Sequence, residues 1–195
     1  MRFSLTDEQV AFRDAVRDLL AQSPPETVWY DLAKMGVFGA AVPESAGGLG
    51  LSDVDLVPVL MELGYAAAAH PVAETILAAP LLVGDPRLAD VLAGATRIAV
   101  VGADRLGAFG GDLILVVDEA VRLVAPEEST VEKAIDPARP LLRVTLPPGG
   151  ELAADPDLVR LRIQLATAAQ LVGVGRRMLD VTTAYVKTRH QFGVP

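Results

Sequence analysis

The sequence predicts an α+β protein with three consecutive parts. An N-terminal helical domain is expected over residues 1–95, because apolar residues recur there at helical spacing. A small antiparallel β domain is expected over residues 96–150, where short β-rich runs alternate with turn residues. Over residues 151–195 one long helical pattern predicts the first helix of a C-terminal helical bundle that is truncated in this chain.

Capping signals define the helices of the first part. Thr6 and Gln9 form a T-x-x-Q capping box ahead of an apolar face that carries Phe12, Val16, Leu19 and Leu20. A short helix through Trp29 and Leu32 follows, and a glycine-rich loop runs from there to Leu51. Three further starts are predicted: Ser52 as a cap, Pro71 before residues 72–82, and Asp85-Pro86 as a cap with proline in the first helical position. Pro58 lies inside the helix that Ser52 begins, where it removes one backbone hydrogen bond.

Five short β-rich runs predict an antiparallel sheet or a small barrel. Glycine, aspartate and proline separate them, as is typical of tight turns. The runs are Arg97–Val101, Leu113–Val117, Val121–Val124, Val131–Ile135 and Leu141–Leu146. Pro147-Pro148-Gly149-Gly150 then forms a linker to the last helix.

The last helix is expected to begin at the Asp155-Pro156 cap and to extend to about Thr188, a length of roughly 50 Å. Small residues at Ala166, Ala169, Gly173 and Gly175 would let a neighbouring helix approach closely. A helix this long cannot bury an apolar stripe against so small a domain, so we expect the stripe to need a partner. The stripe comprises Leu158, Leu161, Leu165, Ala168, Val172, Met178 or Leu179, and Tyr185.

Composition excludes several classes of function. The net charge of −8 argues against nucleic acid and against an anionic membrane face, since both attract basic surfaces. The chain has no cysteine and two histidines, which excludes thiolate metal sites and disulfides. The N-terminus lacks an apolar signal segment, and no apolar run is long enough to span a membrane. A cytoplasmic protein is therefore expected.

Two motifs, in the same order as in a known family, give a more specific indication. Arg189-His190-Gln191-Phe192-Gly193 follows the long helix, and Pro43-Glu44-Ser45-Ala46-Gly47-Gly48-Leu49-Gly50 lies in the glycine-rich loop. Together they resemble the Arg-x-Gln-Phe-Gly and loop motifs of acyl-CoA dehydrogenases. The order of helical, β and helical parts is also similar. The loop lacks the spacing of a phosphate-binding loop, so its expected role is a structural turn.

The resemblance implies α,β-dehydrogenation of an acyl-CoA thioester by a flavoprotein that passes electrons to a carrier. In that family the motif's arginine reaches the FAD pyrophosphate of a neighbouring subunit, and the adjoining positions touch the same flavin. Carried over, this assigns cofactor contacts to Arg189, Gln191 and Phe192, and a guanidinium fork suits phosphate oxygens. The simpler interpretation is a basic residue that complements the helix dipole, followed by Gly193 as a stop.

Two elements of the family pattern are missing. The β region has no Thr-Glu-Pro segment and no Trp-Ile-Thr strand, since residues 102–111 are short and Trp29 is the only tryptophan. The family's catalytic base, a glutamate, would lie beyond Pro195. The resemblance therefore implies either a fragment or the degenerate subunit of a heteromeric enzyme, similar to the actinobacterial steroid side-chain dehydrogenases. We expect both, with FAD shared with a homologous partner subunit and bound weakly or not at all by the chain alone.

This interpretation assigns no catalytic residue within the chain. The substrate would be a fatty or steroid side-chain acyl-CoA, and the partner a homologous subunit or a second copy. Two alternatives remain: a non-catalytic helical module or pseudoenzyme that stabilises a dehydrogenase partner, and an unrelated α+β ligand-binding domain. His70 and His190 are expected to be structural or surface residues, and neither Glu44, Glu62 nor Glu74 is singled out as a base.

Overall fold

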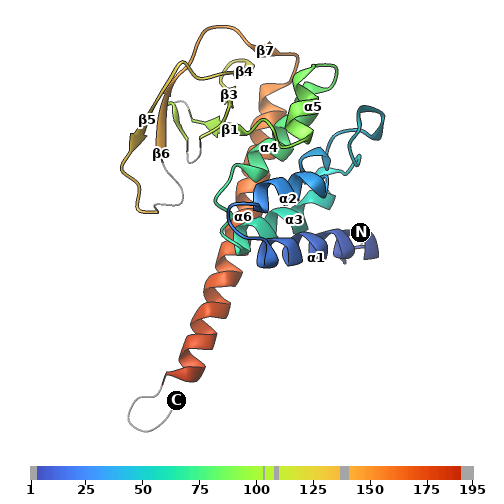
Figure 1. The fold of residues 1–195 in the computed structure, drawn as a ribbon, viewed down its shortest axis with the longest axis vertical. Helices are drawn as coiled ribbons and strands as arrows, with labels where there is room; N and C mark the ends of the chain where they lie inside the picture. Colours follow the sequence, from blue (N-terminus) through green and yellow to red (C-terminus); the bar gives the residue numbers. More distant parts are fainter. Residues whose placement is uncertain (1–3, 103, 108–109, 137–140, 190–195) are drawn as a thin grey trace.

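A computed structural model describes residues 4–102, 104–107, 110–136 and 141–189 of the chain. Figure 1 shows a helical body, a β region beside its upper part, and one long helix that runs through both and projects beyond them. The helices of the body are α1 (Asp7–Gln22), α2 (Val28–Lys34), η1 (Val37–Gly39), η2 (Glu44–Ala46), α3 (Asp53–Tyr65), α4 (Val72–Ala78), η3 (Ala79–Leu82) and α5 (Arg87–Leu92).

The predicted starts of α1, α3 and α4 are confirmed, the first two with side-chain caps. The Thr6 hydroxyl accepts the Gln9 backbone N–H at 3.2 Å, which completes the expected capping box of α1. Ser52 caps α3 and forms a second box with Asp55, and Pro58 lies inside that helix as expected. The start of α5 differs by one residue. It begins at Arg87 with Pro86 in the cap position, although the Asp85 carboxylate accepts the Arg87 N–H, the same bond that a capping aspartate makes.

The β region forms two sheets, where the sequence indicated one sheet or barrel. The first has the order β1-β3-β4-β7 and the second β2-β6-β5. All pairs are antiparallel except β1 with β3, which is parallel. The strands are β1 (Ile98–Val101), β2 (Leu106–Gly107), β3 (Leu113–Val117), β4 (Val121–Val124), β5 (Glu128–Glu132), β6 (Leu141–Thr145) and β7 (Glu151–Leu152).

The prediction placed the fourth β run three residues too late. It was expected at Val131–Ile135, but β5 spans Glu128–Glu132. This strand is exposed along most of its length, so no buried apolar face marks it in the sequence. Its position follows from pairing with β6 instead. The short strands β2 and β7 were missed because two residues carry no periodicity.

The long helix α6 spans Pro156–Thr188, 33 residues, as predicted. The Asp155 carboxylate caps it by accepting the Asp157 N–H. Its first half packs against both parts of the molecule: Ala166 and Ala169 join the core of the helical body, and Val159 joins the core between the helices and the first sheet. Thr75 of α4 links these parts, because its hydroxyl donates to the Ile98 carbonyl and accepts the Ile98 N–H.

Candidate functional site

The first half of α6 lies against α3 with almost no space between the two backbones. A Cβ added to Gly173 would lie 1.9 Å from the Met61 carbonyl oxygen, and one added to Gly64 would lie 2.0 Å from the Gln170 carbonyl oxygen. Real Cβ atoms do not approach backbone atoms this closely. Of the small residues predicted in α6, Ala166, Ala169 and Gly173 are buried and serve a helix contact within this chain, whereas Gly175 is exposed.

Polar contacts accompany this glycine contact along the two helices. Asp53 at the start of α3 pairs with Arg162 at 3.0 Å. Towards the end of α3, the Tyr65 hydroxyl donates to the Asp180 carboxylate at 2.9 Å, and the Arg177 guanidinium lies 5.4 Å from the centre of the Tyr65 ring. The start and the end of α3 are thus each held to α6 by side chains.

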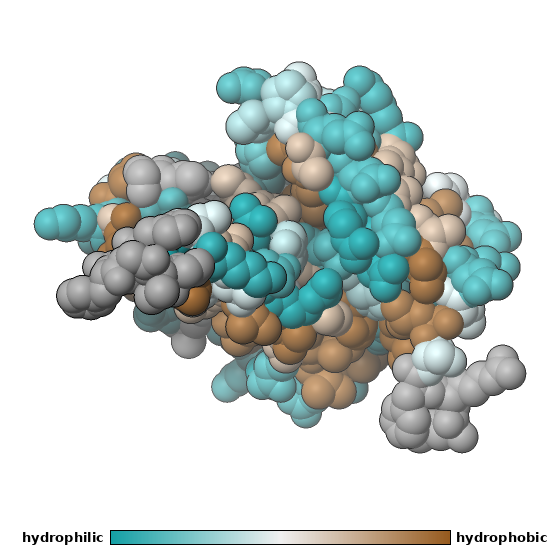
Figure 2. Space-filling model, turned by 90° about the horizontal axis from the view of Figure 1, so that it is seen from below, coloured by the Kyte–Doolittle hydropathy of each residue, from teal (hydrophilic) through white to brown (hydrophobic). Residues whose placement is uncertain are grey.

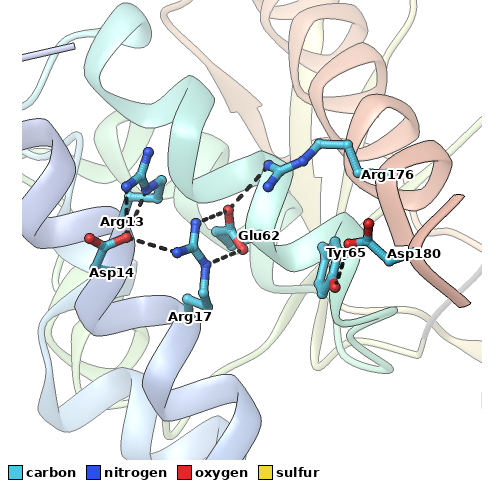
Figure 3. Close-up of polar contacts among 7 residues, drawn as sticks. All are labelled: Arg13, Asp14, Arg17, Glu62, Tyr65, Arg176 and Asp180. Atoms are coloured by element: carbon cyan, nitrogen blue, oxygen red, sulfur yellow. Dashed lines mark hydrogen bonds and ion pairs between the residues drawn. The ribbon is translucent and has the colours of Figure 1, made fainter. Parts of the chain in front are cut away.

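Glu62 is the most buried carboxylate in this region, with 2% of its side chain exposed. Arg17 of α1 donates two hydrogen bonds to it, at 3.0 and 2.8 Å, and Arg176 of α6 approaches to 3.5 Å (Figure 3). Arg17 also pairs with Asp14, so the cluster extends along α1. A single buried charge on α3 therefore joins three helices.

The arginines determine the protonation state of Glu62. The hydrogen bonds from Arg17 hold the pKa of the Glu62 carboxyl below its ordinary value, while burial opposes them. Beside Glu62 is a hollow of about 330 Å³, lined also by Arg17, Tyr65 and Arg177. No sequence motif marked Glu62 as a functional residue. A signal was available, since it is the only charged residue between Leu56 and Gly64 of α3.

The second half of α6 is not covered by any other part of the described chain. Every residue from Gly175 to Arg189 is exposed, and this segment projects from the body in Figure 1. Seen from below, the molecule presents broad apolar patches beside hydrophilic ones (Figure 2). The predicted apolar stripe is on the outer side of α6 and is exposed along its length, as are further large apolar residues. They include Leu158, Leu161, Leu165, Leu171, Val172, Met178, Leu179, Tyr185 and Val186.

Arg189 ends α6 on this exposed segment. Its backbone N–H donates to the Tyr185 carbonyl oxygen at 2.9 Å, and its guanidinium lies 5.5 Å from the centre of the Tyr185 ring. Within the described part of the chain it has no ion-pair partner. The other predicted cofactor contacts, Gln191 and Phe192, lie outside the described residues, as does His190. The structure therefore places one of the three predicted site residues.

The loop at Pro43–Gly50 is built from tight backbone contacts. A Cβ at Gly48 would lie 2.0 Å from the Val42 carbonyl oxygen, and Gly47 and Gly50 have positive φ. These constraints support its interpretation as a structural turn. His70 is half-buried with its ring 5.9 Å from that of Trp29, and burial lowers the pKa of its imidazole.

The turn after β1 is closed by its own hydrogen bonds. The Gly102 N–H donates to the Leu106 carbonyl oxygen, and the Arg105 N–H donates to the Gly102 carbonyl oxygen. Arg105 has a positive φ of 60° and pairs with Asp118 of the β3–β4 turn at 3.0 Å.

Comparison with known proteins identifies the class. Residues 6–86 match the family model described as "Acyl-CoA dehydrogenase, N-terminal domain". The chain is 37% identical over 193 residues to acyl-CoA dehydrogenase FadE34 of Mycobacterium tuberculosis, covering 86% of this chain and 27% of that protein. It is 31% identical over 192 residues to acyl-CoA dehydrogenase IpdE2 of Mycolicibacterium smegmatis, covering 95% of this chain and 61% of that protein.

A solved structure shows the same fold. A variant of the Tcur3481-Tcur3483 steroid ACAD, or acyl-CoA dehydrogenase, superposes with a TM-score of 0.72 at 24% identity, covering 97% of this chain and 69% of the other. The fold is thus that of the acyl-CoA dehydrogenases. Residues 6–86 therefore form the N-terminal domain of an acyl-CoA dehydrogenase, and the chain spans 27–61% of the length of these two curated relatives.

Two other kinds of feature are absent from the described residues. No group of histidine, cysteine, aspartate and glutamate side chains there could hold a metal ion. Among the same residues, no helix is both long enough and apolar enough to cross a bilayer.

Proposed function

We propose that this chain acts as a subunit of an acyl-CoA dehydrogenase that introduces an α,β double bond into a steroid side-chain or fatty acyl-CoA. It completes the FAD site of a homologous partner subunit from outside and is not catalytic alone. One observation carries the proposal: the uncovered half of α6 has large apolar side chains and ends in the exposed guanidinium of Arg189. This segment can dock on another subunit and deliver a cation to its cofactor.

The relatives support the chemistry and the assembly. FadE34 and IpdE2 are named acyl-CoA dehydrogenases. We therefore propose an acyl-CoA substrate and an electron acceptor for the complex that contains this chain. The name Tcur3481-Tcur3483 joins two proteins in one steroid ACAD. A homologous dehydrogenase subunit is therefore the partner we propose, with a second copy of this chain as the alternative.

The residues present fit one part of FAD, its pyrophosphate. A free guanidinium at the end of a projecting helix can donate two parallel hydrogen bonds to phosphate oxygens, and no carboxylate of the described chain competes for it. The turn after β1 does not fit the isoalloxazine ring, because Arg105 and Asp118 close it. When bound in the partner, FAD would accept the hydride that leaves the β-carbon.

Glu62 is a poor candidate for the base that removes the α-proton. An efficient base has a pKa near the working pH. The hydrogen bonds from Arg17 lower the pKa of Glu62 and occupy both carboxylate oxygens. We therefore propose that the partner supplies the base, and that this chain binds the partner and completes its FAD site without removing the proton itself.

Flavin titration of co-purified complexes tests the role of Arg189. Arg189→Ala should weaken flavin retention by about 1.5–3 kcal/mol, the worth of a hydrogen bond to a charged group. Arg189→Lys should restore only part of it, because an ammonium lacks the planar fork. Lys187→Ala is the matched control, since Lys187 is an exposed cation in the last turn of the same helix. Equal affinity in Arg189→Ala and wild type would contradict the proposal and favour a non-catalytic helical module.

The purified chain alone offers a second test. We expect weak or absent flavin absorbance, and no reduction of a dye acceptor with a panel of fatty and steroid side-chain acyl-CoAs. The co-expressed partner should restore both signals. A stoichiometric yellow protein that turns over without a partner would refute the assignment, and absence of flavin with every dehydrogenase partner would favour an unrelated ligand-binding domain.

A further inference from the structure

We propose that Glu62 and Tyr65 are positioning residues that fix the direction in which the free half of α6 leaves the body. Together with Arg17, Arg176 and Asp180 they form what we call the polar brace. The direction itself is a property of this chain. Only its consequence for flavin binding rests on the proposed function.

The glycine contact alone does not set this direction. Gly64 and Gly173 bring the two backbones together without side chains that interlock at the crossing point. Crossing angles between packed helices normally follow from interdigitated side-chain ridges. A contact between two glycines fixes the distance between the axes, so the direction has to be set by contacts elsewhere along α6. Val159, Ala166 and Ala169 supply such contacts before Gly173, and side chains beyond Gly173 have to supply them on the other side.

The polar brace supplies the missing restraint on the far side of the crossing point. Arg176 and Asp180 follow Gly173 by about one and two helical turns. They are held by Glu62 at 3.5 Å and by Tyr65 at 2.9 Å (Figure 3). Glu62 is itself anchored to α1 by Arg17, so the restraint is transmitted to a second helix. On the near side, Asp53 and Arg162 hold the other arm of α6.

The length of the free segment amplifies any change of direction. Arg189 lies 16 positions beyond Gly173, which is about 24 Å at the rise of an α-helix. A tilt of about 10° at the crossing point would move the end of the helix by about 4 Å. A charge-assisted hydrogen bond is made over 2.7–2.9 Å, so such a displacement would remove Arg189 from a phosphate. Contacts near the crossing point therefore determine the position of Arg189 at the end of the helix.

Distances between two spin labels test the polar brace directly. The chain has no cysteine, so Ala11→Cys on α1 and Val186→Cys on α6 give unique labels at exposed positions. In the otherwise unchanged chain we expect one narrow distance distribution. Tyr65→Phe removes one hydrogen bond and keeps the ring, and should shift or broaden the distribution by several Å. Glu62→Gln should broaden it at least as much.

Two controls separate direction from stability. Val16→Ala opens a cavity in the helical core without removing any polar contact of the brace, and should lower the melting temperature without changing the distribution. Lys34→Gln removes an exposed ion pair on α2 and should change neither. The proposal would be overturned if the distance distributions of Tyr65→Phe and Glu62→Gln had the same width and the same mean as that of the doubly labelled parent chain. Broadening of the same size in Val16→Ala would overturn it as well.

A double-mutant cycle in the complex tests the consequence for the flavin. If Tyr65 acts through Arg189, Tyr65→Phe should reduce flavin affinity several-fold in the wild-type background and leave it unchanged in the Arg189→Ala background. Equal losses in the two backgrounds would refute positioning through Arg189. If Arg189→Ala has no effect by itself, the proposed flavin contact fails, and the spin-label distances still decide whether the polar brace sets the helix direction.

Discussion

The two halves of α6 belong to one continuous helix but present opposite surfaces. In the first half Ala166, Ala169 and Gly173 are buried against α3. In the second half the exposed residues include Met178, Leu179 and other large apolar side chains. Small residues are thus used where two helices of the same chain meet backbone to backbone. Large ones occur where the helix is exposed among the described residues.

This difference shows that apolar periodicity alone does not identify the buried face of a helix. The leucine-rich stripe has the stronger hydrophobic signal, yet it is exposed from Leu158 onward. The buried face is determined by what can approach α3 closely. An exposed apolar surface of this extent is typical of a site that binds another protein.

The largest expected effect tests the packing of the first half. Gly173→Ala places a Cβ against the Met61 carbonyl oxygen, so α3 and α6 must separate. We expect it to lower the free energy of unfolding by about 3 kcal/mol or more, as overpacking of a rigid contact does. Gly175→Ala is the matched control. A Cβ there meets nothing within 4 Å, and alanine should stabilise the helix by about 0.5–1 kcal/mol. Denaturant unfolding measures both, and equal values would contradict the comparison.

The second largest effect is expected at the boundary between the two halves of α6. Glu62→Ala leaves Arg17 and Arg176 without their buried partner and should lower the free energy of unfolding by about 2–3 kcal/mol. This is less than for a fully buried pair, because 39% of Arg17 and 46% of Arg176 remain exposed.

The same carboxylate predicts a pH dependence. Its pKa is lower in the folded chain than in the unfolded chain, where it is about 4.3. Its contribution is therefore complete above that value and is lost as the pH falls through the lower, folded value. The difference in unfolding free energy between wild type and Glu62→Gln should be constant near neutral pH and shrink in acid. A difference that stays constant down to pH 3 would contradict this linkage.

A smaller effect is expected at the start of the first half. Asp155→Ala removes the side chain that accepts the Asp157 N–H and should lower the free energy of unfolding by about 1 kcal/mol. Asp155→Asn keeps the acceptor and should cost much less. Thermal unfolding of both variants measures the difference. Equal losses would show that charge at the helix start, rather than the hydrogen bond, is what matters.

Local chemistry made the helices predictable. The Thr6–Gln9 box, the Ser52 cap and the Asp155-Pro156 start each depend on residues within four positions, and the structure has all of them. The β region was harder, since the parallel pairing of β1 with β3 and the separation into two sheets depend on contacts that no local pattern encodes. The exposed strand β5 shows this most clearly.

The candidate site was predictable only in part. The motif identified Arg189 and the periodicity predicted the helix that presents it, while its contact with flavin stays a prediction. The Glu62 cluster joins α1, α3 and α6 over separations of 45 and 114 residues, and such long-range pairing cannot be read from spacing. A lone carboxylate within an apolar helical run was the available sign that a cation would be brought to it.

The smallest effect on the chain itself is expected in the second half of α6. The double variant Met178→Ser and Leu179→Ser replaces two side chains that are 65% and 66% exposed, so the unfolding free energy of the chain alone should change by no more than about 0.5 kcal/mol. If a dehydrogenase partner covers this surface, the same variant should weaken assembly at least tenfold, about 1.4 kcal/mol. Thr182→Ser, an exposed polar position on the same helix, is the matched control and should assemble as wild type does. Analytical ultracentrifugation of the chain with its co-expressed partner measures the difference. Unchanged assembly would show that the partner does not cover the outer side of α6. A large loss of stability in the isolated chain would show that the second half of α6 contributes to the free energy of unfolding, as the first half does, despite its exposure.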